Sequence, residues 1–117
     1  MSSPMETVTK YYEAAARKDR KALRAVLAPE FTFKGPLMAF DGPDAFVEAI
    51  VGMAFDAEPE GSRFIVDGER VAHAFLWKMK TPTTAEVPMC EVFEVSGGRI
   101  CSSELFYDSK LFPAPRS

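Results

Sequence analysis

At 117 residues, the chain has room for one domain with one hydrophobic core, and we expect a single domain over residues 1–117. Its net charge of -3 and single histidine argue against a nucleic-acid-binding protein, which needs a basic face. The N-terminus has no secretory leader pattern, and no apolar run is long enough to span a bilayer, so neither secretion nor a membrane partner is predicted. Cys90 and Cys101 form neither a disulfide framework nor a metal-ligand pattern, so we expect a cytoplasmic protein with no metal or other cofactor.

Three helices are predicted in the N-terminal half. The first begins at Ser3, because Ser3 and Glu6 have the spacing of a capping box and apolar residues follow at helical spacing. A second, short helix begins after Asp19, a typical N-cap residue. A third helix follows the turn at 41–43, and the turn-forming residues 58–61 are expected to end it.

Strand-like alternation dominates the second half of the chain. After a short early strand at 31–34, the apolar period changes from 3.6 to 2, and the strands are then expected at 64–66, 70–80, 87–95 and 100–107. Asp67-Gly68 and Gly97-Gly98 are strong hairpin-turn signals between them. Helices followed by a meander of strands predict an α+β fold, in which the helices cover one face of a curved antiparallel sheet.

Both faces of this sheet are expected to be covered. In the strand at 70–80, one face carries His73, Phe75 and Trp77, and the other face is also apolar. A sheet that is half open to water should show polar residues across its second face. The residues expected on this second face are Ala72, Ala74, Leu76, Cys90, Val92 and Phe106. We therefore expect a homodimer formed through the second face, the alternative being a modest apolar patch on a monomer.

Five motifs carry a family resemblance: Tyr11 with Asp19, the stretches 26–33 and 93–100, the turn at 41–43, and the closing residues 106–108. On these residues the chain resembles the nuclear-transport-factor-two-like superfamily, specifically its SnoaL-like and ketosteroid-isomerase-like branch. The resemblance covers nearly the whole chain. It implies a cone-shaped half-barrel whose concave face is covered by about three N-terminal helices. Because this superfamily places many activities on one fold, no single reaction is implied.

The resemblance also assigns positions. It places Tyr11 at the oxyanion-hole tyrosine of the steroid isomerases and Glu91 at the protonated carboxylic acid beside it. The catalytic aspartate of those isomerases falls on Gly35. The arginine and the two aspartates of the related epoxide hydrolases fall on Arg70, Ala72 and Leu105. The last-strand aspartate of polyketide cyclases also falls on Leu105, so the resemblance favours none of these three mechanisms.

Strand pairing predicts a polar row on the helix-covered face. If Lys80 pairs with Thr84, His73 lies directly opposite Glu91, and a register shifted by one step still leaves the two side chains a diagonal apart. Across the next hairpin, pairing of Val95 with Arg99 puts Ser103 opposite Glu91. An imidazole and a carboxyl coupled in this way can titrate near neutrality, where general acid–base catalysis is most efficient. The alternative is a buried pair whose two members simply satisfy each other.

We therefore expect His73, Glu91 and Tyr11 to be the catalytic residues of a pocket for a small hydrophobic molecule. The expected substrate-binding residues are Phe33, Phe55, Phe75, Trp77, Met89, Ser103, Leu105 and Tyr107. Tyr12 is interpreted as a packing or lining residue. The function predicted is a cofactor-free acid–base enzyme, such as an isomerase, dehydratase or cyclase. The alternatives are a non-catalytic small-molecule-binding or dimerisation module, and an accessory partner of a larger enzyme.

Overall fold

The computed structural model describes residues 3–53, 56–81 and 83–111, in which three α-helices precede a meander of long strands. The elements are α1 (Pro4–Arg17), α2 (Arg20–Ala25), β1 (Leu27–Lys34), β2 (Ala39–Phe40), α3 (Pro43–Gly52), β3 (Asp56–Asp67), β4 (Arg70–Thr81), β5 (Ala85–Ser96), β6 (Arg99–Tyr107) and a 3-10 helix (Ser109–Leu111). The predicted α+β order is confirmed. None of the helices in these ranges has the length and apolar character needed to cross a bilayer.

Local capping chemistry sets the helix boundaries. The Ser3 hydroxyl accepts a hydrogen bond from the Glu6 backbone N–H at 3.1 Å, and the Glu6 carboxylate accepts one from the Ser3 N–H at 3.3 Å. The predicted capping box is therefore formed. Lys18, in a left-handed conformation with φ of 53°, ends α1. Asp19 then caps α2 by accepting from the Ala22 N–H at 3.1 Å, as predicted.

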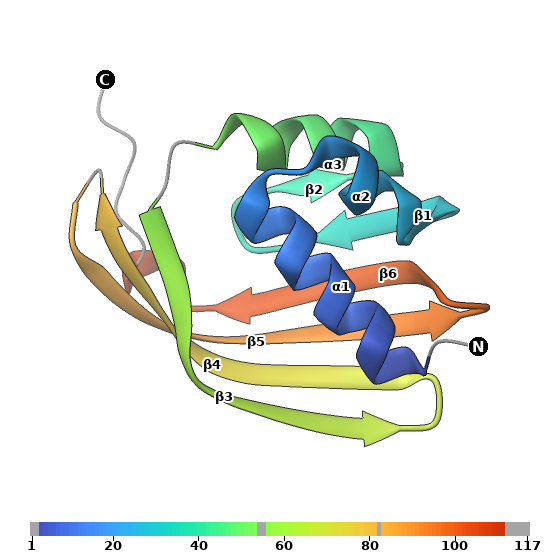
Figure 1. Cartoon of the computed structure of the whole chain (residues 1–117). Coiled ribbons are helices and arrows are strands. Elements are labelled where there is room, and N and C mark those ends of the chain that lie inside the picture. Colours follow the sequence, from blue (N-terminus) through green and yellow to red (C-terminus); the bar gives the residue numbers. More distant parts are fainter. Residues whose placement is uncertain (1–2, 54–55, 82, 112–117) are drawn as a thin grey trace.

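The strands form one curved sheet in the order β2-β1-β6-β5-β4-β3, and Figure 1 shows the long strands bending around α1. The strands β3 to β6 pair antiparallel as a meander, as expected. Gly97 and Gly98 adopt φ of 60° and 75° in the turn between β5 and β6, which their sequence signal predicted. The sheet is antiparallel as expected, except that β1 pairs with β6 in parallel, with Phe33 beside Ser103. The long connection between these two strands allows the chain to return in the same direction.

Strand β3 is longer than predicted. The turn-forming residues 58–61 were expected to end a helix, but the strand Asp56–Asp67 runs through them. Pro59 is tolerated because β3 is an edge strand, where one side of the backbone has no strand partner. The pairing with β4 shifts between Glu60 and Arg63, where Gly61 has φ of 65°. The residues that were predicted to form a turn therefore form a β-bulge within the strand.

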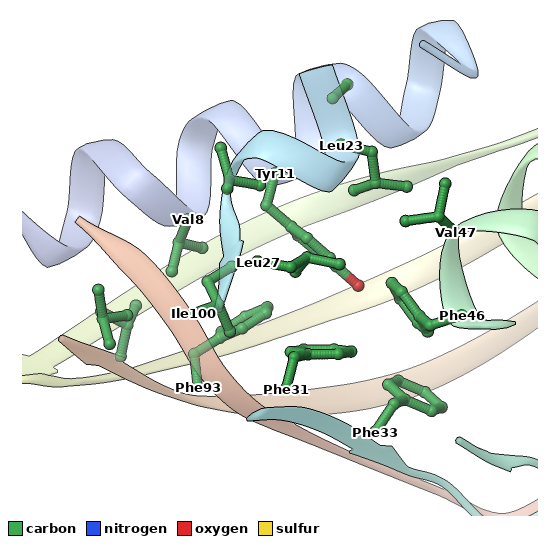
Figure 2. Close-up of a cluster of buried hydrophobic side chains, with 14 residues drawn as sticks. Val8, Tyr11, Leu23, Leu27, Phe31, Phe33, Phe46, Val47, Phe93 and Ile100 are labelled. Atoms are coloured by element: carbon green, nitrogen blue, oxygen red, sulfur yellow. The ribbon is translucent and has the colours of Figure 1, made fainter. Parts of the chain in front are cut away.

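The helices cover the concave face of the sheet and bury the main core against it. In Figure 1, α1 lies across the long strands, and α3 lies over β1 and β2. Figure 2 shows Phe31, Phe46 and Phe93 gathered between the helices and the sheet, and each of them is at most 1% exposed. Burying an aromatic side chain of this kind stabilises the fold by roughly 2–3 kcal/mol.

The convex face also carries apolar side chains, as predicted. Its central residues Ala72, Ala74, Leu76, Cys90 and Val92 are half-buried, so that each keeps some exposed surface. On the neighbouring strands β3 and β6, Ile65 is 68% exposed and Phe106 is 49% exposed. Ion pairs close both ends of this face, from Arg70 to Glu94 at 3.1 Å and from Lys78 to Glu86 at 3.6 Å. The convex face is thus an apolar surface between two charged ends.

Candidate functional site

Pairing between β4 and β5 places two polar residues side by side on the concave face. His73 lies opposite Glu91, and Phe75 lies opposite Met89, which confirms the register predicted from the loop near Pro82. Both polar side chains are buried, with exposed fractions of 1% for His73 and 4% for Glu91. Side chains on this face alternate with those on the convex face, so both residues point toward the helices.

The register between β5 and β6 differs from the prediction. Glu91 lies opposite Leu105, and Ser103 lies opposite Phe93, two residues from the expected partner. The two-residue turn pairs Ser96 with Arg99, and a bulge between Glu94 and Val95 shifts the register further. Ser103 still reaches the site, because a diagonal neighbour on the same face lies within side-chain range.

The carboxylate of Glu91 is the centre of a buried hydrogen-bond cluster. Its Oε2 atom accepts from the Ser103 hydroxyl at 2.5 Å and from the Tyr11 hydroxyl at 3.2 Å. Its Oε1 atom accepts from the Tyr12 hydroxyl at 2.7 Å. Burial raises the pKa of Glu91, and the three hydroxyl donors partly oppose that rise by stabilising the ionised form.

Both tyrosines of this cluster come from consecutive positions of α1. Figure 2 shows the Tyr11 side chain extending from α1 into the core, where its ring packs at 5.2 Å from the ring of Phe93. The neighbouring Tyr12 is half-buried, and its ring meets His73 edge-on at 4.8 Å. Burial and the nearby Glu91 carboxylate raise the pKa of both phenols, so both hydroxyls remain protonated donors.

Tyr12 was predicted to be a packing or lining residue, and its hydrogen bond to Glu91 was not predicted from the sequence. Consecutive helical residues point about 100° apart, so only their distance from the sheet decides whether both can reach one acceptor. The pair Tyr11-Tyr12 on an otherwise Ala-rich stretch was the available signal. Of the residues in this cluster, the family resemblance named only Tyr11 and Glu91, and these two residues are hydrogen-bonded in the structure.

His73 is enclosed by aromatic rings and makes no hydrogen bond within the described ranges. Both ring nitrogens are buried without a partner. The imidazole stacks on Phe64 at 4.1 Å and on Phe75 at 4.3 Å, and because two stacked rings cannot share one face, it lies between them. Burial lowers the pKa of His73 to about 4. The expected coupling with Glu91 is therefore not seen, since the imidazole neither bonds to the carboxylate nor has its pKa raised by it.

The predicted lining residues largely gather at one end of the concave face. Phe75, Val87 and Met89 form a buried cluster, against which the half-buried residues Trp77, Leu105 and Tyr107 pack. Phe33 belongs to the neighbouring main core, and Leu105 touches both clusters. Phe55 lies outside the described residues.

Two hollows of the described surface are lined by residues other than the cluster of Tyr11, Tyr12, Glu91 and Ser103. One, of about 760 Å³, is formed by α2, α3 and Arg99. The other, of about 530 Å³, lies between residues 34–36 and the end of β6, and it contains Gly35 and Tyr107. Two of the three positions matched to family catalytic aspartates, Gly35 and Leu105, thus line this second hollow, whereas Ala72 does not. Arg70, matched to the epoxide-hydrolase arginine, instead pairs with Glu94 on the convex face.

Metal ligation finds no support in the described part of the chain. It holds no group of three or more His, Cys, Asp or Glu side chains arranged to bind an ion. The groups available for chemistry at this site are one buried carboxyl, its three hydroxyl donors and a neutral imidazole.

Solved structures share this architecture. A nuclear-transport-factor-two-like protein from Cytophaga hutchinsonii superposes with a TM-score of 0.80 at 17% identity, over 94% of both chains. An epoxide hydrolase of M. tuberculosis superposes with a TM-score of 0.78 at 19% identity, over 92% of this chain and 84% of the other. A Pseudomonas putida protein provisionally named a polyketide cyclase gives 0.79 at 20% identity, over 96% of each chain. These similarities establish the nuclear-transport-factor-two-like fold and leave the reaction open.

Comparison of the sequence with family models identifies the family of the chain. A family model for the SnoaL-like domain matches residues 8–103, which is most of the chain. The protein belongs to the SnoaL-like domain family, as the motifs at 26–33 and 93–100 predicted. No curated protein gives a significant match.

Proposed function

We propose that this SnoaL-like protein is a cofactor-independent acid–base enzyme of the isomerase or lyase type, acting in the cytoplasm on a small hydrophobic molecule. Glu91 is its proton-transferring group. The observation that carries this proposal is a carboxyl that is 4% exposed, has a raised pKa and is held by three hydroxyl donors. A carboxyl whose pKa is raised toward neutrality suits general acid–base catalysis, and such groups concentrate at functional sites.

The apolar surroundings support a hydrophobic substrate. Half-buried Trp77, Leu105 and Tyr107 border the cluster of Phe75 and Met89, so this end of the concave face keeps accessible apolar surface. Pockets for small molecules are mostly apolar, with a few polar groups that fix orientation. In this proposal His73 and Tyr11 are neighbours of Glu91. His73 stacks with Phe75 and helps to exclude solvent from the carboxyl, and Tyr11 donates a hydrogen bond to it. The free thiols of Cys90 and Cys101 support the cytoplasmic location.

The test is turnover after substitution of the carboxyl. A panel of small aromatic and alicyclic ketones, enones and alcohols is screened with the wild-type protein, and any activity is then measured in Glu91→Gln and His73→Ala. General acid–base groups contribute about 10²- to 10⁴-fold, so Glu91→Gln is expected to lower kcat by at least about 100-fold. Ser102→Ala is the control, since Ser102 bonds to the exposed Glu94 rather than to Glu91. Full turnover in Glu91→Gln removes the assignment.

A second candidate is a non-catalytic module that binds a small molecule or dimerises. Two observations favour it: the position of the steroid-isomerase base is Gly35, and every hydroxyl of the cluster is already bonded to Glu91. This candidate predicts saturable ligand binding with no chemical change in the recovered ligand. Proton NMR and mass spectrometry of the ligand after prolonged incubation together separate the two candidates, because an isomerisation changes the NMR spectrum without changing the mass.

We also propose that the chain forms a homodimer through the convex face. Ile65 and Phe106 leave large apolar surfaces exposed there, and ion pairs involving Arg70 and Lys78 flank them. Two copies related by a two-fold axis would bury this surface while keeping charged groups at its edges. Light scattering coupled to size exclusion is expected to give twice the chain mass. A monomer at high micromolar concentration contradicts the proposal.

A further inference from the structure

The hydrogen atoms of the cluster around Glu91 are all directed inward. Tyr11, Tyr12 and Ser103 each carry one hydroxyl hydrogen, and each donates it to the Glu91 carboxylate. A hydroxyl that has donated its hydrogen still offers lone pairs but has no second hydrogen to donate. The three hydroxyls therefore present only acceptor oxygens to a ligand while Glu91 is ionised.

The acceptor positions are unevenly occupied. Oε2 of Glu91 receives two donors from the described residues, Tyr11 and Ser103, whereas Oε1 receives one, Tyr12. Each carboxylate oxygen has two lone-pair positions, so the open position of the carboxylate lies on Oε1. Tyr12 is also the accessible member of the cluster, since it is half-buried while Tyr11, Glu91 and Ser103 are at most 5% exposed. A ligand reaching this cluster thus meets the Tyr12 oxygen and Oε1.

Neutral His73 does not change this conclusion. Its one N–H hydrogen belongs to a side chain that is 1% exposed, with Phe64 and Phe75 on its faces and Tyr12 at its edge. Reaching it requires the displacement of an aromatic ring, whereas Oε1 lies beside the accessible tyrosine. A carbonyl oxygen needs a donor, and the hydroxyl hydrogens of Tyr11, Tyr12 and Ser103 are already donated to Glu91.

We propose that the cluster binds a hydroxyl group of its ligand, with Tyr12 and Oε1 of Glu91 as the acceptors, so that the substrates are small apolar alcohols, phenols or enols rather than ketones. This inference rests on the proposed function only in taking the cluster as the ligand site. It differs from the oxyanion-hole role that the family resemblance implied for Tyr11, because the Tyr11 hydroxyl hydrogen is already bonded to Oε2. A hydroxyl bound to an ionised carboxylate forms a charge-assisted hydrogen bond, which is stronger than a neutral one.

The preference depends on the charge of Glu91. The polar groups that face this carboxyl are Tyr11 and Tyr12 from α1, Ser103 from β6 and His73 from β4. Burial raises the pKa of Glu91, so the carboxyl gains its proton at a higher pH than an exposed glutamate. A proton on the open position of Oε1 turns that atom into a donor, which can bond to a carbonyl. The selectivity is therefore expected to change direction as the pH falls.

The test compares indan-1-ol with indan-1-one, two probes of nearly equal size that differ in offering a donor or only an acceptor. Binding to the full-length wild-type protein is followed by the proton NMR signals of His73, which are unambiguous because the chain has one histidine. At pH 8 the alcohol is expected to bind at least about fivefold more tightly, since the ketone leaves the acceptor atoms of the cluster without a donor. As the pH is lowered from 8, the ratio should fall as Glu91 gains its proton.

Equal binding of both probes at pH 8, tighter binding of the ketone there, or no binding of the alcohol up to its solubility limit would each overturn the proposal. Glu91→Gln is expected to lose most of the preference, because an amide offers donor hydrogens as well as an acceptor. Ser102→Ala should keep it. Since the readout is binding, the result is separable from the proposed function: selective binding without turnover removes the enzyme but leaves the hydroxyl site.

Discussion

The buried imidazole of His73 is expected to make folding stability depend on pH in a measurable way. Its pKa falls to about 4 in the folded protein, because its nitrogens are buried without a partner. In the unfolded chain the pKa is the ordinary value of about 6.5. Above that pH the imidazole is neutral in both states and has no effect. Between about pH 6.5 and pH 4 only the unfolded chain binds the proton, so the free energy of unfolding decreases as the pH falls.

The size of the effect follows from the shift. Each pKa unit corresponds to about 1.36 kcal/mol, so complete protonation of the unfolded chain lowers the free energy of unfolding by about 3 kcal/mol. Glu91 acts in the opposite direction, because its raised pKa makes the folded protein bind that proton first. The variant His73→Phe removes the imidazole, keeps a flat ring between Phe64 and Phe75, and leaves Glu91 in place. The difference between wild type and variant therefore isolates the imidazole.

The assay is urea unfolding at pH 7.5 and at pH 4.5, followed by the fluorescence of the single tryptophan, Trp77. Between these two pH values, the wild type is expected to lose about 2–3 kcal/mol relative to His73→Phe. A relative change below about 0.5 kcal/mol, the usual scatter of neutral substitutions, would refute the conclusion that the imidazole is buried and neutral. A relative gain for the wild type at pH 4.5 would show that the protonated ring finds a partner.

Three further outcomes are expected. Ser103→Ala should lower the free energy of unfolding by about 1–3 kcal/mol, because it removes a 2.5 Å hydrogen bond to buried Glu91. Ser102→Ala, which removes a bond to exposed Glu94, should change it by less than about 0.5 kcal/mol. Equal effects of the two substitutions in urea unfolding would contradict this difference in burial. Gly98→Ala should destabilise the folded protein by about 1–2 kcal/mol, because the backbone φ of 75° is unfavourable for alanine. Gly52→Ala, in a helix where the added Cβ meets no atom within 4 Å, should stabilise the protein by up to about 1 kcal/mol; both are measured by thermal unfolding. If the proposed convex-face dimer forms, Ile65→Lys should raise its dissociation constant by at least about tenfold, measured by analytical ultracentrifugation. Leu37→Lys, a change at another exposed apolar residue outside that face, should not.

Several features of this protein could be predicted from the sequence, because nearby residues determine them. The capping box at Ser3, the cap at Asp19 and the turn at Gly97-Gly98 depend on interactions within a few residues. The register that sets His73 opposite Glu91 could also be predicted, since a short loop joins the two strands and the alternation of side chains fixes the face. The family followed from motifs spread along the chain.

Other features were decided only by the tertiary structure. The bulge beside Glu94 moved Ser103 from the predicted partner, and the edge position of β3 let a strand run through Pro59. Whether His73 bonds to Glu91 depended on which hydroxyls the helix α1 brings to the sheet and on which rings of β3 and β4 flank the imidazole. Tyr12 reaches the carboxylate, and Phe64 and Phe75 enclose the imidazole. Strand alternation specifies the face of a side chain, but competition among neighbours from distant segments selects its hydrogen-bond partner, and that competition exists only in the folded protein.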